Sequence, residues 1–471
     1  MAEISRSQRP ALRRDLWWAR ITCLSVFGPY VTGSARTEQV VVFASFVLVL
    51  VVGWPRIAQS RQFAPAPMLT AWIGMYTIML IATAFRAFDP GFYGSQPPSH
   101  ALADCLLPVA LMTLTWFWTI RTDSISLIRA VAPVAVAGMC VNTVIEVLQL
   151  RAKTAAIVGF LPHFWVAAPS IGSVAANAAG DNRFTGIFDQ PAEAGIAYGL
   201  AIFFLTWMAR RRVICSARLV TLTAILLVVG GVLTLSKVFL LGAVPLAMIT
   251  VLRDSARIKV LFTAVCTTAG LGLAGSTGIL PGWQPEVAGL VRLLRPGNSI
   301  AAEYTAGRYG TAGGGVPVVS DVLRFSPWAG FGSGGLNVPY DSLWIQTLIL
   351  SGVLGVLLVA SGLAMLAFRW LQLRRLMEVP EWHLAGSAVA LAIGASLGIP
   401  SLTANRASTL RWLIIGVLVT AHLGDRTNQV LMIQVNPEAR PLPSPTYRHE
   451  YQADASAIKA LPILIEDSRL T

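Results

Sequence analysis

Apolar runs of about 17 to 25 residues recur along most of this chain, and they limit its fold more than any other feature. The hydrocarbon core of a bilayer is ~30 Å thick, and about 20 apolar residues in a helix cross it. Twelve runs meet this requirement: 17–34, 38–54, 67–85, 101–120, 125–149, 191–209, 218–235, 237–252, 260–280, 341–367, 383–400 and 408–424. We therefore predict an all-α polytopic membrane domain over residues 1–424, with about twelve transmembrane helices.

The composition agrees with this class. Of the 471 residues, 55% are hydrophobic and 13% are charged, whereas soluble domains carry about 25% charged residues. The mean hydropathy is +0.64, and the combination excludes a soluble enzyme. The five cysteines lie in or beside apolar runs without metal-ligand spacing, so we expect neither a disulfide framework nor a zinc site.

Basic residues predict the orientation. They form dense clusters in short loops that the twelve runs place on one side: Arg6, Arg9, Arg13, Arg14 and Arg20; Arg210, Arg211 and Arg212; Arg253, Arg257 and Lys259; Arg369, Arg374 and Arg375. Loops rich in Lys and Arg stay in the cytoplasm. Both termini are then cytoplasmic, and two long loops, 150–190 and 281–340, face outward. A shift of one run, for instance the weak first run, would invert this orientation.

The net charge of +13 is accounted for by these loops and by phosphate contacts, so no nucleic-acid partner is expected. Residues 425–471 change to polar, proline-containing sequence, which predicts a partly disordered cytoplasmic tail.

Three acidic residues fall near the predicted outer ends of their runs: Asp104, Glu146 and Glu193. A charge near the middle of the membrane costs about 2.5–3.5 kcal/mol on insertion scales. These side chains could reach back to the interface, or they could line a polar cavity that opens outward. The sequence leaves both readings open.

The end of the first long loop combines an arginine with a helix start. Arg183 precedes a glycine-containing turn, and Asp189 and Pro191 are typical of a helix N-terminus. Guanidinium groups and helix N-termini both attract phosphate. We therefore take Arg183 as a candidate phosphate ligand.

The second long loop is rich in glycine and ends at another membrane helix. Arg308 lies at its front, the stretch FSPWAGFGSGG follows, and Asp341 and Ser342 open the next run. Asp341 could simply cap that helix. Gly352 and Gly355, one turn apart, would suit close helix packing.

Four segments between residues 180 and 424 resemble, in order, the O-antigen ligase and O-antigen polymerase (Wzy-type) superfamily of membrane glycosyltransferases. RFTGIFDQP is similar to its R-x-x-G-x-F-x-x-P-N segment, LTLSK to its L-T-x-S-R helix start, and AGRYGTAGGGVPVVSDVLRFSPWAGFGSG to its G-R stretch leading to P-x-x-G-x-G. Asp341, Ser342, Gly352 and Gly355 match the spacing of the ligase pattern H-[NSQ]-x9-G-x2-[GTY]. The chain departs from the family at Ala192, Lys237 and Asp341, which stand where Asn, Arg and His are common.

The resemblance implies transfer of a growing glycan from a polyprenyl-pyrophosphate donor to a second lipid-linked repeat unit. The transfer would take place at the outer face of a bacterial inner membrane, without a metal or other cofactor. A chain-length regulator and a flippase are candidate partners in that setting. Arg183 and Arg308 would then stabilise the pyrophosphate leaving group, and Asp341 would accept the proton of the attacking hydroxyl. Lys237, Glu303 and Ser342 are the expected substrate-binding residues, with Asp321 as a further acidic candidate.

Two alternatives remain at this stage. Ligases that move a finished glycan rely on the histidine that Asp341 replaces, so the aspartate favours polymerisation over ligation. Twelve spans also suit a transporter, which would place polar residues on broken helices in two matching halves. The polar residues of this chain concentrate instead in one late loop, and no duplication of halves is visible.

Overall fold

The computed structural model describes residues 9–31, 35–53, 67–85, 98–152, 164–166, 171–180, 183–251, 315–332, 342–374, 377–400, 402 and 406–417. All belong to one compact unit, Glu3–Asp425. Of the described residues, 83% are helical and none forms a strand, which confirms the predicted helical class. The predicted tail, 425–471, lies outside them.

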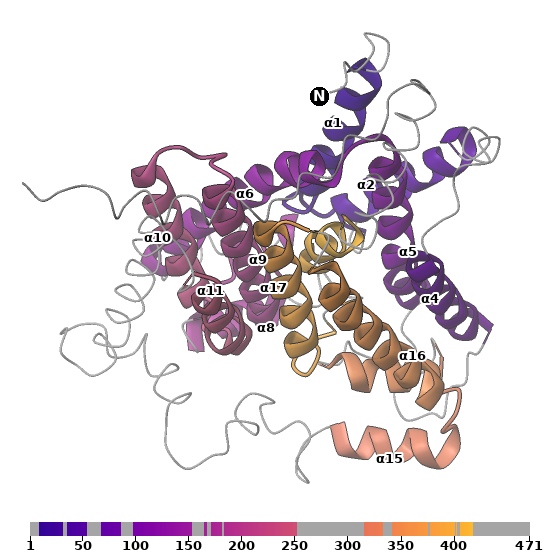
Figure 1. Ribbon diagram of the computed structural model, residues 1–471. Helices are drawn as coiled ribbons and strands as arrows, with labels where there is room; N and C mark the ends of the chain where they lie inside the picture. The colour runs from indigo at the N-terminus through magenta and orange to yellow at the C-terminus, as the bar shows by residue number, and fades with distance from the viewer. Residues whose placement is uncertain are drawn as a thin grey trace, which may run out of the picture. The chain divides into compact units, whose positions relative to one another are not determined.

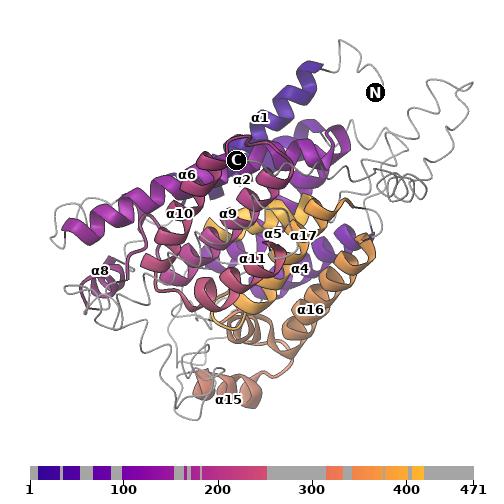
Figure 2. The ribbon, with the colours of Figure 1, turned by 60° about the vertical axis from the view of Figure 1, so that its left-hand side comes forward.

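Figures 1 and 2 show the helices, coloured from indigo at the N-terminus to yellow at the C-terminus. Their bounds are α1 Arg9–Ser25, α2 Thr37–Leu48, η1 Val49–Gly53, α4 Pro67–Phe85, α5 Pro98–Arg121, α6 Ser124–Ala152, α8 Ile171–Gly180, α9 Pro191–Arg210, α10 Ala217–Leu233, η3 Val238–Ala243, α11 Val244–Val251, α15 Gly315–Phe325, α16 Leu343–Leu373 and α17 Val379–Ala395. Residues 406–417 are also helical, and η1 and η3 are π-helical turns.

Three of these helices, α6, α9 and α16, are long and apolar enough to cross a membrane. Their length and composition indicate a membrane protein. Shorter apolar helices occupy other predicted runs, whereas the run 260–280 lies outside the described residues. The total of about twelve spans, the inner membrane and the orientation of the termini therefore stay predictions.

The predicted bounds of the first run are wrong. The structure begins α1 at Arg9 and ends it at Ser25, whereas the run was placed at 17–34. Pro29 carries no amide hydrogen and disfavours helical geometry at Gly28, so the apolar residues around this pair do not continue the helix.

The helix α9 forms the centre of the packing. It contacts α6, α10, η3, α11 and α17, and Figure 1 shows it among α6, α10 and α17. Small residues allow the close approach, since a Cβ added at Gly195 would meet Ser236 and one added at Gly199 would meet Ala243. Almost every residue of α9 is consequently buried.

In contrast, α6 and α16 each expose one apolar stripe. The stripe on α6 includes Val141, Val144 and Leu148, and the stripe on α16 includes Leu354 and Leu357. Their spacing places the members of each stripe on one face. A helix at the edge of a membrane bundle is expected to present such a face to lipid.

Ion pairs connect the C-cap residue of α9, Arg211, to the start of α17. Arg211 Nε donates to Glu381 Oε1 at 2.6 Å, and its Nη1 lies 2.7 Å from Glu378 Oε2. Trp207 Nε1 also donates to Glu381 Oε1, at 2.7 Å. The hydrogen bond to Glu381, followed by the one to Glu378, raises the pKa of Arg211, so this guanidinium remains charged.

Candidate functional site

The structure explains the glycine, the phenylalanine and the proline of the motif between α8 and α9. Gly186 has φ 61°, and a Cβ there would lie 2.0 Å from Asn142 Oδ1, so only glycine fits. Phe188 is fully buried. Pro191 begins α9 after an extended Gln190, which confirms the helix start predicted from the sequence.

Polar side chains of α6 hold this turn. Asn142 Oδ1 accepts from the amide of Ile187 at 2.9 Å, and its Nδ2 donates to Glu146 Oε1 at 2.9 Å. Gln149 exchanges two hydrogen bonds with the backbone of Gly186, at 3.1 and 3.2 Å. The backbone of residues 186 and 187 is thereby fixed against the last turns of α6.

Glu146 and Glu193 do not extend to the protein surface. Both are almost completely buried, and Glu193 Oε1 accepts from the backbone amide of Arg406 at 2.6 Å. Of the two readings that the sequence left open, reaching back to the interface is therefore wrong for this pair. The side chain of Asp104 lies outside the described residues.

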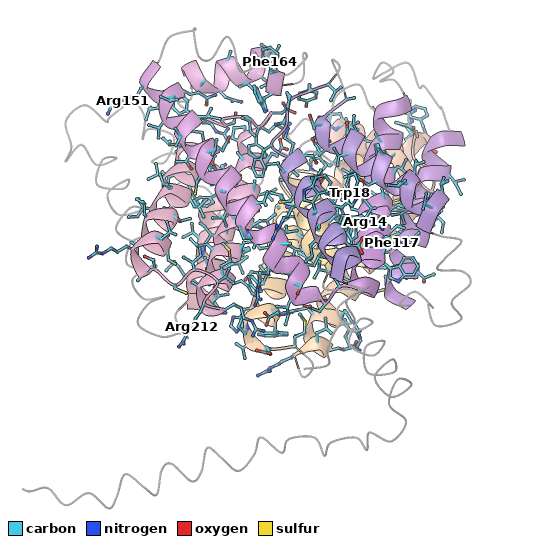
Figure 3. All side chains as sticks on the ribbon, turned by 90° about the horizontal axis from the view of Figure 1, so that it is seen from above. Arg14, Trp18, Phe117, Arg151, Phe164 and Arg212 are labelled. Carbon is cyan, nitrogen blue, oxygen red and sulfur yellow. The ribbon has the colours of Figure 1, made fainter. Side chains whose placement is uncertain are left out.

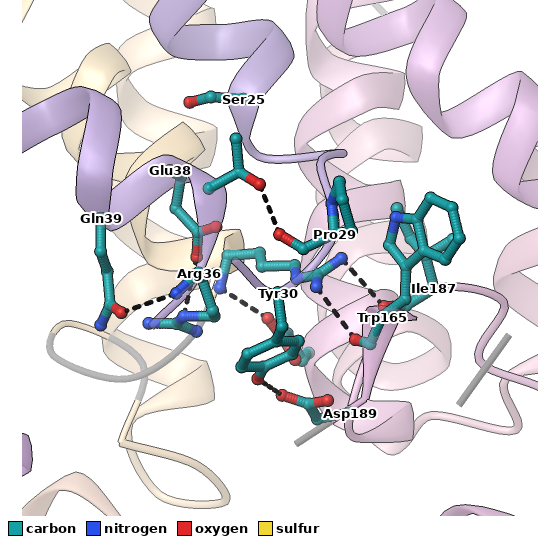
Figure 4. A network of polar contacts seen from close by, with 12 residues as sticks. Ser25, Pro29, Tyr30, Arg36, Glu38, Gln39, Trp165, Ile187 and Asp189 are labelled. Carbon is teal, nitrogen blue, oxygen red and sulfur yellow. Dashed lines mark hydrogen bonds and ion pairs between the residues drawn. The ribbon is translucent and has the colours of Figure 1, made fainter. Parts of the chain in front are cut away.

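Arg406 connects three parts of the chain. Its guanidinium donates to the backbone oxygens of Ile187 at 3.0 Å and of Trp165 at 2.9 Å, and lies 5.4 Å from the centre of the Tyr30 ring. Tyr30 in turn donates to Asp189 Oδ2 at 2.6 Å. Figure 4 shows the Tyr30 hydroxyl beside Asp189, with Trp165 and Ile187 close to the Tyr30 ring.

A second buried arginine extends this network. Arg36 Nε lies 2.9 Å from Glu38 Oε1, and both side chains are buried. Burial alone would lower the pKa of Arg36, but Glu38, Tyr30, Glu193 and Asp189 raise it above its ordinary value, so the group stays charged. We call Tyr30, Arg36, Glu38, Asp189, Glu193 and Arg406 the Arg406 cluster.

Neither arginine of the Arg406 cluster was predicted from the sequence as a site residue. A usable signal existed, because Arg36 and Arg406 stand in short connections that the predicted topology places outside, where the positive-inside rule disfavours arginine. In contrast, Arg151 and Arg212 are exposed and extend away from the helices in Figure 3. An arginine that occupies an unfavoured loop and is buried needs a structural or functional reason.

Arg183, a predicted catalytic residue, joins two of the motifs. Its Nε donates to the backbone oxygen of Thr234 at 3.4 Å, and the amide of Phe184 donates to the oxygen of Leu233 at 3.0 Å. Thr234 belongs to the LTLSK segment, which ends in the half-buried Lys237 at the start of η3. The first and second motifs are thus in direct contact.

The third and fourth motifs are also in contact, through backbone. The amide of Phe331 donates to Ile349 O at 2.6 Å, and the amide of Val353 donates to Pro327 O at 2.8 Å. Gly352 has φ 63° and ψ −160°, which interrupts α16. The expectation that Gly352 serves helix packing is therefore wrong, because it receives the 327–331 segment instead.

Ser342 is the N-cap of α16. It is buried, and its Oγ accepts from the amide of Ile345 at 3.4 Å. Arg308, Glu303 and Asp341 lie outside the described residues. Asp321 lies half-buried on α15. The roles of these residues, and of Arg183 and Lys237, stay predictions.

A cavity of about 310 Å³ opens among α1, α2, η1 and α5. Arg14, Trp18 and Phe117 line it and lie together in Figure 3. Its lining includes no residue of the four motifs or of the Arg406 cluster. We therefore centre the candidate site on the Arg183 segment.

Within the described part of the chain, no group of three or more His, Cys, Asp or Glu residues could hold a metal ion. Comparison with known proteins adds no family: no protein-family model matches the chain, and no curated protein matches it significantly.

Proposed function

We propose that this protein polymerises polyprenyl-pyrophosphate-linked oligosaccharide repeat units into a surface polysaccharide. The reaction would take place at the outer face of the bacterial cytoplasmic membrane, in a bundle of about twelve helices with both termini in the cytoplasm. The enzyme would be a metal-independent glycosyltransferase.

The contact between the first two motifs carries this proposal. Arg183 Nε and Thr234 O are joined, and Lys237 follows three residues after Thr234. A diphosphate leaving group carries several negative charges, and guanidinium and ammonium donors held at fixed positions stabilise them as they develop. The resemblance adds Arg308 as a third cation.

These residues could support each part of the transfer step. The acceptor hydroxyl oxygen attacks the anomeric carbon of the donor, the bond from that carbon to the diphosphate oxygen breaks, and the lipid diphosphate leaves with the electron pair. Asp341 would take the hydroxyl proton as general base. Ser342 and Glu303 would bind the sugar near it.

The positions of the buried charges support an outward site. The predicted topology assigns the start of α2, the end of α6 and the start of α9 to the outer side, and the Arg406 cluster with Glu146 lies at these helix ends. Arg211 and its carboxylate partners lie at the other end of α9. Agreement between independent contacts and the predicted topology favours a polar site at the outer end.

One observation favours transport as a second function. The helix α16 is broken at Gly352, and the buried Gln346 Oε1 and Ser351 Oγ have no hydrogen-bond partner among the described residues. Transporters bind solutes at such breaks. However, the backbone groups freed at Gly352 are bonded to the 327–331 segment, which supports a structural role for the break.

The test is glycan length in a strain that lacks the gene, complemented with wild type, Arg183→Ala, Arg308→Ala or, as a control, Arg151→Ala at equal membrane levels. Polymerisation predicts single repeat units in the deletion strain and with both motif variants, and a full ladder with wild type and Arg151→Ala. Long glycan that remains unattached would indicate ligation. Unchanged glycan would reject both glycosyl-transfer reactions and favour transport.

A further inference from the structure

The length of α16 poses a problem for a simple membrane crossing. It has 31 residues, or about 46 Å of helix, against a hydrocarbon core of ~30 Å. The break at Gly352 divides it, and residues 353–373 alone supply the ~20 residues that a span needs. The residues before Gly352 are thus not required for crossing.

The two parts of α16 differ in the side chains that they bury and expose. Before the break, Gln346, Thr347 and Ser351 are buried polar residues. After it, Leu354 and Leu357 are more than half exposed. Only the second part presents an apolar face suited to lipid.

The first part of α16 is attached to the end of a neighbouring helix. The amide of Leu343 donates to the oxygen of Ser396 at 3.0 Å, and Ser396 is the C-cap of α17. Because α17 has 17 residues, its end already lies about one span from its start. Leu343 is therefore held at the membrane boundary rather than a further turn beyond it.

The helix α15 lies against this first part and is amphipathic. Val318 and Val322 are buried against Ile345 and Ile349. Beside that contact, Val316 and Leu323 are exposed by 40% and 48%. They lie seven residues apart, and thus on one face.

The exposed face of α15 becomes polar beside these two residues. Ser320 is exposed next to Val316 and Leu323, Arg324 is exposed further around the helix, and Asp321 is half-buried. The Arg324 guanidinium lies 5.3 Å from the centre of the Phe325 ring. An apolar shoulder beside a cationic face is typical of helices that lie in a membrane interface.

Trp328 follows α15 by three residues and lies beside the apolar stripe of α16. Its indole is 64% exposed, and its backbone oxygen accepts from the amide of Leu354 at 3.3 Å. Leu354 itself is 52% exposed. One apolar surface therefore continues from Leu354 and Leu357 to Trp328, and tryptophan is enriched at the level of lipid head groups.

We infer that α15 and Trp328 lie in the interfacial layer of the bilayer at the level of Gly352. Val316, Leu323 and Trp328 contact lipid, Arg324 faces the phosphates, and residues 343–351 lie along the membrane boundary between Leu343 and Gly352. The partner of this surface is the lipid bilayer. The inference depends on α16 crossing the membrane and not on the proposed glycosyl transfer.

The experiment places an environment-sensitive fluorophore on single cysteines in a variant without the five native cysteines, reconstituted into phosphatidylcholine and phosphatidylglycerol nanodiscs. The probes are Leu323→Cys, Val316→Cys and Trp328→Cys. Arg324→Cys, about 100° around α15 from Leu323, and Leu357→Cys on α16 are the controls. Elution as a single species verifies that each variant is folded.

We expect the three probes to be quenched severalfold more by lipids that carry a spin label near the head group than by aqueous iodide. The Leu357→Cys probe should respond more to a label along the acyl chain than to one near the head group, and the Arg324→Cys probe should respond more to iodide than the Leu323→Cys probe. Equal iodide quenching at Leu323 and Arg324, or an absence of lipid quenching at Leu323 and Val316, would overturn the inference.

Discussion

Gly330 and Gly352 cross backbone to backbone. A Cβ added at Gly330 would lie 2.6 Å from the amide nitrogen of Gly352, and one added at Gly352 would lie 2.4 Å from the carbonyl carbon of Trp328. Both glycines have positive φ, 67° and 63°. The absence of a Cβ at each glycine leaves the space that the backbone of the other segment occupies.

Replacement of Gly352 by alanine should destabilise the protein. The positive φ alone costs about 1–3 kcal/mol for a residue with a Cβ, and the contact with Trp328 adds to it. The measurement is the apparent melting temperature in detergent, followed by tryptophan fluorescence. Gly74→Ala is the control, since a Cβ at this helical position meets nothing within 4 Å and alanine should be neutral or favourable. Equal melting temperatures for Gly352→Ala and wild type would contradict the described crossing.

Arg406→Gln should lower the free energy of unfolding by about 3–5 kcal/mol, as expected when one partner of a buried charge cluster is removed. Glutamine leaves Asp189 and Glu193 with one cation fewer and loses the fork to two carbonyl oxygens. Arg406→Lys should recover part of the loss, because it restores charge without the paired donors. Denaturant titration checks this against Arg151→Gln, an exposed arginine that should tolerate the change. A small effect for Arg406→Gln would mean that the cluster is solvated.

The two carboxylates that contact Arg211 should differ in their contribution to stability. Glu381 is 4% exposed and binds both Arg211 and Trp207, so Glu381→Gln should cost about 2 kcal/mol. Glu378 is 67% exposed, and Glu378→Gln should cost less than about 1 kcal/mol. Thermal unfolding of both variants at low and high salt measures the difference. The reverse order would refute the described geometry.

Tyr30→Phe tests the link between the α1–α2 connection and the turn before α9. The variant loses the hydrogen bond to Asp189 and keeps the ring beside Arg406, so we expect a loss of about 1–2 kcal/mol. Tyr30→Ala removes the ring as well and should be worse. Denaturant unfolding compares the two. A Tyr30→Phe variant as stable as wild type would show that the hydroxyl contributes nothing, and equal losses in both variants would show that the ring adds nothing.

Apolar run length predicted the helices well where nothing interrupts a run. The run 67–85 coincides with α4, and Pro191 marks the start of α9. The method failed at Pro29, which it counted within an apolar run, and at Gly352, where a glycine in a helix and a glycine at a break have the same sequence signal. The backbone break at Gly352 depends on contact with the 327–331 segment, which lies more than twenty positions earlier in the chain.

The candidate site was only partly predictable for the same reason. The Arg183 motif was located, and the structure explains its glycine and proline. Asn142, Gln149 and Arg406, which hold it, come from distant helices, and no local pattern indicates that such residues meet. The predicted roles of Arg308 and Asp341 concern residues that the structure does not describe, so they remain hypotheses for the glycan assay.

The bond between Arg406 and Glu193 spans 213 residues of sequence. At about 5–20 residues per second, ribosomes need roughly 10–40 s to synthesise that interval. During this time Glu193 is already part of an apolar helix while its partner has not been made. The early helices must therefore be retained, by the insertion machinery or by a loose bundle, until the helix that follows Arg406 has been made. The Arg406 cluster can form only when synthesis of the membrane domain is nearly complete.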